Sequence, residues 1–194
     1  ALSPYGNTKQ INEEIIHDFL AVNQGLHCIA LRYFNPVGAH PSSLIGELPL
    51  GVPANLVPFI TQTAAGIREC LSVFGNDYNT PDGTPIRDYI DIIDLANAHI
   101  SAINRMEENK QKSSLEFFNI GTGRGLSVLE LIKTFEEATG VKLNYKIVGR
   151  RAGDIEKVWA DTSYANKELG WKAVVPLKET LLNAWKWQQK LADN

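Results

Sequence analysis

Segments with the apolar spacing of a helix alternate along this chain with short runs of β-branched and aromatic residues. The first helical segment carries one apolar stripe, made of Ile11, Ile15, Ile16, Phe19 and Leu20. An apolar run follows at residues 27–34, and Asn35 with Pro36 is expected to end that strand. Because a helix followed directly by a strand is the repeating unit of a parallel sheet, this order predicts an α/β fold.

The alternation continues to the end of the chain. The pattern predicts helices at 55–69, from an N-cap at Asp94 onward, from a capping box of Ser127 and Glu130 to Gly140, at 161–169 and at 177–191. It predicts strands at 71–74, 89–93, 115–120 and 143–148. Residues 1–10 are expected to be a loop that runs into the first helix, and turn-forming residues predict loops at 38–53 and 75–85.

The composition of the 194 residues excludes several classes of protein. Hydrophobic residues make up 44% and charged residues 21%, a balance typical of globular rather than disordered chains. The net charge of −3 leaves no basic excess, so we expect no nucleic-acid partner. No apolar run approaches the roughly 20 residues that a membrane span needs, so we expect no membrane partner.

The cysteines and histidines predict neither a disulfide framework nor a metal site. Cys28 and Cys70 form no close-spaced motif, and the four histidines lack the spacing of metal ligands. A reducing, cytosolic setting fits this cysteine usage best.

Tyr5 and Lys9 lie four residues apart where the chain enters its first helix, so their side chains share a face. An ammonium group beside a phenol stabilises the phenolate and lowers the phenol pKa. Lowering that pKa by about three units requires about 4 kcal/mol of differential interaction. A phenol tuned in this way can move a proton to and from an alcohol, although the spacing by itself also arises by chance.

Two other features have a plain structural interpretation. The stretch Gly121-Thr122-Gly123-Arg124-Gly125 is similar to a dinucleotide-binding loop, but Leu126 follows where a glycine is needed and no acidic residue ends the next strand. We interpret this stretch as a tight strand-to-helix turn. Arg87 and Asp88 could form a surface ion pair of little energetic value.

A series of short motifs extends over the whole chain. In order they are Ser3-Pro4-Tyr5-Gly6-Asn7-Thr8-Lys9, Arg32-Tyr33-Phe34-Asn35-Pro36-Val37-Gly38-Ala39, Pro53-Ala54-Asn55-Leu56-Val57-Pro58, Val73-Phe74-Gly75-Asn76-Asp77-Tyr78, Arg87-Asp88-Tyr89-Ile90-Asp91, Arg150-Arg151-Ala152-Gly153-Asp154 and Trp159-Ala160-Asp161. This series resembles the C-terminal part of the UDP-glucose 4-epimerase family, a branch of the extended short-chain dehydrogenases/reductases. The resemblance covers essentially all 194 residues.

The resemblance implies a fold and an activity. Residues 1–36 would be the last part of a Rossmann-type parallel-sheet domain that binds NAD. Residues 37–194 would form mainly a smaller α/β domain for the UDP-sugar, with short segments returning to the Rossmann sheet. The activity would be NAD-dependent interconversion of UDP-glucose and UDP-galactose through a 4-keto sugar, a step of galactose metabolism, and the complete protein would be a homodimer.

The resemblance also assigns roles to single residues. Tyr5 would be the catalytic base, Lys9 would hold the nicotinamide ribose and tune Tyr5, and Tyr33 and Phe34 would border the nicotinamide. The substrate would contact Asn35, Asn55, Leu56, Ser72, Val73, Phe74, Arg87, Arg151, Asp154 and Val158. Among these, the arginines suit phosphate oxygens, and the amides suit sugar hydroxyls. The small Val158 would act as a size gate that also admits UDP-N-acetylhexosamines.

Three positions depart from the family pattern. Ala54 replaces an asparagine, Asp91 replaces a frequent histidine and has no assigned ligand contact, and Arg150 beside Arg151 leaves two candidates for the nucleotide grip. The family's glycine-rich NAD loop lies upstream of the matched part, so we expect a fragment or a second chain that supplies it, and we expect residues 1–194 alone to be inactive.

Two alternative functions stay open at this point. A nucleotide-sugar dehydratase or decarboxylase of the same superfamily would share these motifs. A non-catalytic UDP-sugar-binding module would need the nucleotide contacts but no tuned phenol, so Tyr5 and Lys9 argue against it.

Overall fold

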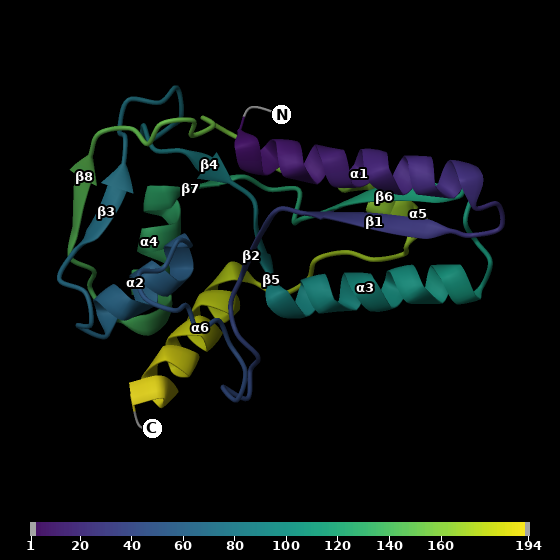
Figure 1. Ribbon diagram of the computed structural model, residues 1–194. Helices are drawn as coiled ribbons and strands as arrows, with labels where there is room; N and C mark the ends of the chain where they lie inside the picture. The colour runs from purple at the N-terminus through teal and green to yellow at the C-terminus, as the bar shows by residue number, and fades with distance from the viewer. Residues whose placement is uncertain (1–2, 193–194) are drawn as a thin grey trace.

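The computed structural model describes residues 3–192 and shows two lobes side by side (Figure 1). One lobe contains α1 (Pro4–Val22), β1 (Cys28–Tyr33), α3 (Ile92–Glu107), β6 (Leu115–Ile120) and α5 (Ser163–Glu168). The other contains α2 (Leu56–Ala64), β3 (Leu71–Phe74), α4 (Val128–Thr139), β8 (Tyr145–Val148) and α6 (Leu177–Ala192). The short strands β2 (Asn35–Val37), β4 (Ile86–Arg87), β5 (Tyr89–Asp91) and β7 (Leu126–Ser127) lie where the lobes meet.

Most strand pairs are parallel and join segments that are distant in the sequence. β1 pairs with β6 from Cys28 opposite Leu115 to Tyr33 opposite Ile120. β2 pairs with β5 and β3 pairs with β8, both in parallel, whereas β4 and β7 are antiparallel. Parallel pairing needs long crossover connections, which here contain the helices. The predicted α/β class is therefore confirmed.

The first helix begins earlier than the sequence pattern predicts. Residues 1 and 2 of the expected loop lie outside the described part, and α1 starts at Pro4. Ser3 is its N-cap, because its side chain accepts a hydrogen bond of 3.0 Å from the Gly6 N–H. Proline fits the first helical position, where its missing N–H costs nothing. The loop prediction for residues 4–10 is therefore wrong.

Other elements also compare closely with the prediction. The strand predicted at 27–34 ends at Tyr33, before Asn35 and Pro36, as expected, but these two residues begin an unpredicted strand, β2, in which the Asn35 N–H donates to the Asp88 carbonyl at 2.9 Å. The helix predicted at 55–69 ends at Ala64, followed by Gly66 at a positive φ of 73°. The strand predicted at 89–93 ends at Asp91, which begins α3 as its N-cap.

Two clusters of buried residues form the cores. The cluster of the α2/α4/α6 lobe includes Ile60, Val73, Leu131, Phe135 and Leu181. The cluster of the β1–β6 lobe includes Ile90, Leu95, Phe118, Ile120 and Trp171. The apolar stripe of α1 belongs to neither cluster: of its members only Leu20 is buried, and Ile15 and Phe19 are 60% and 54% exposed.

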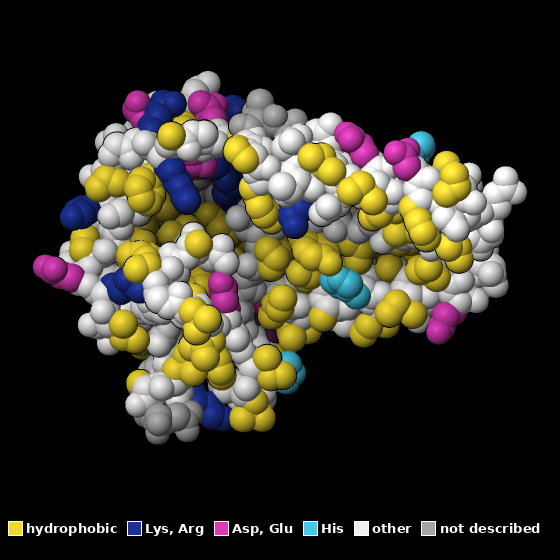
Figure 2. Space-filling view, viewed as in Figure 1, with side chains coloured by type: hydrophobic (Ala, Val, Ile, Leu, Met, Phe, Trp, Pro, Cys, Tyr) yellow, Lys and Arg dark blue, Asp and Glu magenta, His cyan; other side chains and the backbone are white. Residues whose placement is uncertain are grey.

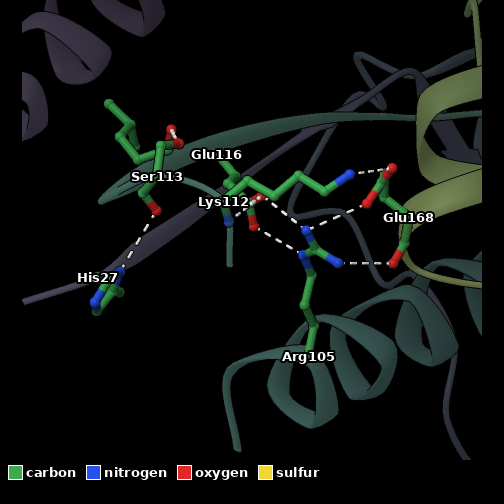
Figure 3. Close-up of polar contacts among 7 residues, drawn as sticks. His27, Arg105, Lys112, Ser113, Glu116 and Glu168 are labelled. Carbon is green, nitrogen blue, oxygen red and sulfur yellow. Dashed lines mark hydrogen bonds and ion pairs between the residues drawn. The ribbon is translucent and has the colours of Figure 1, made fainter. Parts of the chain in front are cut away.

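A buried ion-pair network joins three elements of the β1–β6 lobe (Figure 3). Arg105 on α3 donates two hydrogen bonds of 2.8 and 2.9 Å to the Glu116 carboxylate on β6, and one of 2.9 Å to the Glu168 carbonyl on α5. Lys112 donates to the Glu168 carboxylate at 2.6 Å. The hydrogen bonds from Arg105 lower the pKa of the Glu116 carboxyl. A paired buried arginine fixes the relative positions of these elements.

Two further properties concern the described residues as a set. No helix within residues 3–192 combines the length and the apolar character needed to cross a membrane. Nor does this part of the chain bring three or more His, Cys, Asp or Glu side chains together in an arrangement that could hold a metal ion.

Candidate active site

An open cavity of about 1600 Å³ lies where α1, the β1–β2 connection, the start of α2, β3 and β4 meet. Figure 2 shows this hollow in the left half of the view, with hydrophobic side chains in its floor and Lys or Arg side chains at its rim. All of the predicted site residues except Val158 line it: Tyr5, Lys9, Tyr33, Phe34, Asn35, Asn55, Leu56, Ser72, Val73, Phe74, Arg87, Arg151 and Asp154. Residues from the two ends of this series, Tyr5 and Asp154, therefore face one space.

Tyr5 and Lys9 lie on the first turns of α1. The Lys9 ammonium nitrogen is 5.0 Å from the centroid of the Tyr5 ring, and the Tyr5 side chain is 73% exposed. The Ser3 N-cap fixes the turn that carries them. The pair thus presents a phenol and an ammonium group side by side to the cavity.

Tyr33 is held by a residue that the sequence did not single out. Its hydroxyl lies 2.6 Å from His99 Nε2, and His99 Nδ1 lies 2.9 Å from the Leu95 carbonyl. Since a carbonyl only accepts, Nδ1 carries the hydrogen and Nε2 accepts from Tyr33. His99 therefore orients an aromatic residue of the cavity wall.

Arg87 does not pair with its neighbour Asp88 in the way the sequence allowed. Its guanidinium forms a short ion pair with Asp154 and donates to the Ile86 carbonyl at 2.8 Å. The Arg87 side chain is only 16% exposed, so this pair is partly buried. Arg87 therefore links β4 to the segment that carries Arg151 and Asp154, and brings these residues to one side of the cavity.

Asp88 has a different structural role. It is fully buried and accepts hydrogen bonds from the N–H groups of Thr122, Gly123 and Ala160 and from the Thr122 hydroxyl. A side chain at Gly121 would place its Cβ 2.6 Å from an Asp88 oxygen. The glycines of this turn therefore let the backbone pack on Asp88, in agreement with the structural interpretation from the sequence.

The two adjacent arginines have different surroundings. Arg150 donates to the Asp77 carboxylate at 2.7 Å and to the Asp77 carbonyl at 2.6 Å, and its guanidinium carbon lies 4.0 Å from the Tyr78 ring centroid. Arg151 lines the cavity, and Arg150 does not. The structure thus favours Arg151 for a ligand contact.

Tyr89 and Asp91 both lie on β5 but differ in their relation to the cavity. Tyr89 lines the cavity although it was not predicted, and burial raises the pKa of its phenol well above the ordinary value. Its only sequence signal was its place between Arg87 and Asp91. Asp91 does not line the cavity, because it caps α3 and accepts from the Ile93 N–H at 2.7 Å.

Val158 lies outside the cavity wall. It is half-buried in a segment that runs beside β4, and its N–H donates to the Ile86 carbonyl at 3.1 Å. Its role as a size gate therefore stays a prediction.

The parallel strand pairs and the helices that connect them place this chain in the class of Rossmann-type α/β folds. A family model described as GDP-mannose 4,6 dehydratase matches residues 1–183. The chain belongs to this family.

Curated relatives are named UDP-glucose 4-epimerase. The protein of Dictyostelium discoideum is 52% identical over 188 residues, and that of Homo sapiens is 45% identical over 188 residues. The matches cover 97% of this chain but 54% and 53% of those proteins. The chain therefore spans about half the length of the curated relatives it matches.

Solved structures agree with this family. The UDP-glucose-4-epimerase of Stenotrophomonas maltophila, with bound NAD and formylated UDP-arabinopyranose, superposes with a TM-score of 0.94 at 49% identity. The enzyme of Bifidobacterium longum, in complex with NAD+ and UDP, gives 0.92 at 44%. Both matches cover 98% of this chain and 56% of the other. The resemblance to the UDP-glucose 4-epimerase family is confirmed.

Proposed function

We propose that this chain forms the substrate-binding part of an NAD-dependent UDP-glucose 4-epimerase, an isomerase that interconverts UDP-glucose and UDP-galactose. The observation that carries the proposal is the single cavity that gathers the Tyr5–Lys9 pair with Arg87, Arg151 and Asp154. A reaction on a nucleotide sugar needs groups that transfer a proton, here Tyr5 and Lys9, and groups that bind the diphosphate, here Arg87 and Arg151. In this chain both sets face the same cavity.

The donor set fits one end of NAD. Lys9 and Tyr5 offer polar groups for ribose hydroxyls, and Tyr33 and Phe34 offer aromatic surface beside them. The chemistry that NAD supplies when bound is the acceptance and return of a hydride at sugar C4. The glycine-rich turn at 121–125, which the sequence offered as a candidate for binding the NAD phosphates, packs on Asp88 instead. We therefore propose that a further half, like the part of the relatives that this chain does not cover, holds the NAD phosphates.

The chain's own residues divide the remaining work. Tyr5 takes the proton of the sugar 4-hydroxyl and returns it, while Lys9 stabilises the phenolate between these events. Arg87 and Arg151 bind the diphosphate, and the exposed ring of Phe74 supplies a face for the base. An epimerase must hold the nucleotide firmly while the hexose presents both faces, so the binding energy belongs at the nucleotide end.

The division of the chain into domains is part of this proposal. We assign residues 1–36 to a Rossmann-type domain and most of residues 37–194 to the substrate domain. The pairing of β6 with β1 supports a return of the later segment to the first layer. A homodimer and a cytosolic location complete the proposal, as the resemblance and the cysteine usage imply.

UDP-N-acetylhexosamines are proposed as additional substrates on the basis of Val158. Valine is small and donates no side-chain hydrogen bond, so it can admit an acetamido group but cannot hold it. The contact with the sugar requires the bound hexose to reach the segment beside β4, where Val158 lies.

The direct test is incubation of the NAD-loaded complete protein with UDP-galactose, followed by chromatographic and mass analysis of the product. An epimerase yields UDP-glucose of unchanged mass. A product lighter by one water would instead support the dehydratase alternative, which the name of the matched family model keeps in view. Loss of carbon dioxide from UDP-glucuronate would support a decarboxylase, and binding of UDP without turnover of any of these substrates would support a binding module.

A further inference from the structure

The side chain of Asn55 is oriented by a residue outside the cavity. Asn55 Nδ2 donates a hydrogen bond of 2.7 Å to the Glu47 carboxylate. A carboxylate at neutral pH accepts hydrogen bonds and donates none, so the amide nitrogen of Asn55 must face it. The amide oxygen and one N–H then remain for other partners.

The position of Asn55 at a helix start makes this orientation informative. Asn55 is the N-cap residue of α2, where an asparagine side chain commonly accepts from the first turn of the helix. Here it makes no side-chain capping bond, and it lines the cavity instead. The Asn55 side chain therefore binds Glu47 and faces the cavity, and it does not cap the helix.

Glu47 is in turn held by the last helix. The Trp187 indole N–H on α6 donates to the Glu47 carbonyl at 2.9 Å. The preceding residue is Gly46, and a Cβ there would lie 2.4 Å from two atoms of the Trp187 ring. Only glycine lets the backbone press against the indole, so Gly46 and Trp187 together set the place of Glu47.

A second contact holds the same loop closer to Asn55. Arg68 donates to the Gly51 carbonyl at 3.1 Å, and it is itself fixed by a hydrogen bond of 2.7 Å to Gln62 on α2. The loop is thus tied to α6 at Glu47 and to the end of α2 at Gly51, and Asn55 follows these two ties.

We propose that Glu47 is a positioning residue for Asn55, an inference that rests on the proposed function. By holding the amide nitrogen, Glu47 turns the Asn55 oxygen toward the cavity, where it can accept from a hydroxyl of the substrate. The second N–H of the amide can donate to a substrate oxygen. Asn55 therefore presents its oxygen as an acceptor for the ligand, and Glu47, which is not part of the cavity lining, sets this orientation.

A purely electrostatic role for Glu47 makes the opposite prediction. A carboxylate near an anionic nucleotide repels it, so removing the charge alone should tighten binding. Positioning requires instead that the loss of Glu47 weakens binding, and that the loss depends on Asn55.

The experiment is calorimetric titration of UDP-glucose into the NAD-loaded complete protein and its variants Glu47→Ala, Glu47→Gln, Asn55→Ala and the Glu47→Ala/Asn55→Ala double variant. Asn55→Ala should weaken binding about tenfold, the scale of one to two neutral hydrogen bonds. Glu47→Ala should weaken it about threefold to tenfold by freeing the Asn55 amide to rotate. Glu47→Gln should stay within about twofold of the wild type, because its amide oxygen still accepts from Asn55.

The double variant tests whether Glu47 acts through Asn55. If Glu47 acts through Asn55, the double variant binds no more weakly than Asn55→Ala. Additive losses, unchanged or tighter binding by Glu47→Ala, or a Glu47→Gln variant as weak as Glu47→Ala would overturn the proposal. Failure of the proposed function has a separate signature: the wild type would then not bind UDP-glucose, or Arg87→Ala would leave its affinity unchanged.

Discussion

At the scale of single residues, the arginines show how context divides one residue type into two roles. Arg87 and Arg151 face the cavity, whereas Arg150 is held by Asp77 and stacks on Tyr78. Arg87 is also engaged, by Asp154 and the Ile86 carbonyl, but it lines the cavity, whereas Arg150 lies outside the cavity lining. The same residue type thus contacts a neighbouring loop at position 150 and lines the cavity at position 151.

Replacement of these arginines by alanine should separate the roles. Arg87→Ala and Arg151→Ala are each expected to weaken UDP binding by about 1.5–3 kcal/mol, the scale of a charge-assisted hydrogen bond. Arg150→Ala is the matched control and should change the affinity by less than about 0.4 kcal/mol, or twofold. Calorimetry with UDP measures all three, and losses below about 0.5 kcal/mol for both Arg87 and Arg151 would place them outside the nucleotide site.

The sequence could predict which residue types the site needs but not all of their partners. Motifs that are similar to a known family pointed to the residues of the cavity wall, and the structure brings nearly all of them together. The contact of His99 with Tyr33 and the pairing of Arg87 with Asp154 could not be predicted, because each joins segments that are distant in the sequence. Glu47 lies in the same loop as Asn55, but no local pattern marked it as a partner. Only the fold shows that His99 on α3 reaches Tyr33 at the end of β1.

At the scale of elements, Asp91 shows how a helix start depends on tertiary contacts. The pattern predicted the cap at Asp94, which precedes apolar helical residues, and this prediction is wrong. The structure selects Asp91, because Asp94 is buried and accepts from the N–H groups of Val174 and Val175, each at 2.9 Å. Asp91 is only 3% exposed, and its Oδ2 has no hydrogen-bond partner among the described residues. Burial raises the pKa of this carboxyl.

Asp91→Asn should therefore stabilise the protein at neutral pH. The pKa of Asp91 is higher in the folded than in the unfolded state, so its contribution to the free energy of unfolding is fully present below the unfolded pKa. It is lost as the pH rises through the folded pKa. Asparagine keeps the N-cap acceptor and carries no charge.

Thermal unfolding of the complete protein provides the measurement. Asp91→Asn should melt above the wild type at about pH 7, with a difference that shrinks toward about pH 4. Asp91→Ala is the control that also removes the cap, and it should be less stable than Asp91→Asn by about 1 kcal/mol at both pH values. A wild type that is more stable than Asp91→Asn at neutral pH would contradict the assigned burial effect.

The long helices and strands could be predicted, and the shortest strands could not. The hydrophobic periodicity of α3, α4 and α6 and the capping box of Ser127 and Glu130 are local signals that the structure retains. The two-residue strands β4 and β7 exist only because they pair with each other. β2 contains Pro36, which local rules treat as a strand end, and it forms because β5 lies beside it.

At the scale of the whole molecule, α1 exposes an apolar face to solvent. Ile11, Ile15, Phe19 and Val22 are 41–80% exposed, although their spacing is that of a helix face packed against a core. An apolar face of this kind is costly in water and favours association. The proposed NAD-binding half provides a cover for it.

The isolated 194-residue chain should therefore bind NAD weakly and self-associate. Sedimentation velocity should show concentration-dependent association, which a double Ile15→Lys/Phe19→Lys variant reduces. Val174→Lys, a change at a remote position that is 73% exposed, should leave the association unaltered. A monomeric chain that converts UDP-galactose alone would contradict the proposed need for a second half.

The central claim is that Tyr5 transfers the proton of the sugar hydroxyl, while other residues of the same cavity bind the nucleotide. The most direct measurement compares the turnover of UDP-galactose and the affinity for UDP in the complete wild-type protein and in Tyr5→Phe. The account predicts a loss of turnover of about two to four powers of ten, the usual contribution of a general acid–base, with UDP affinity nearly unchanged. Near-normal turnover by Tyr5→Phe would contradict it.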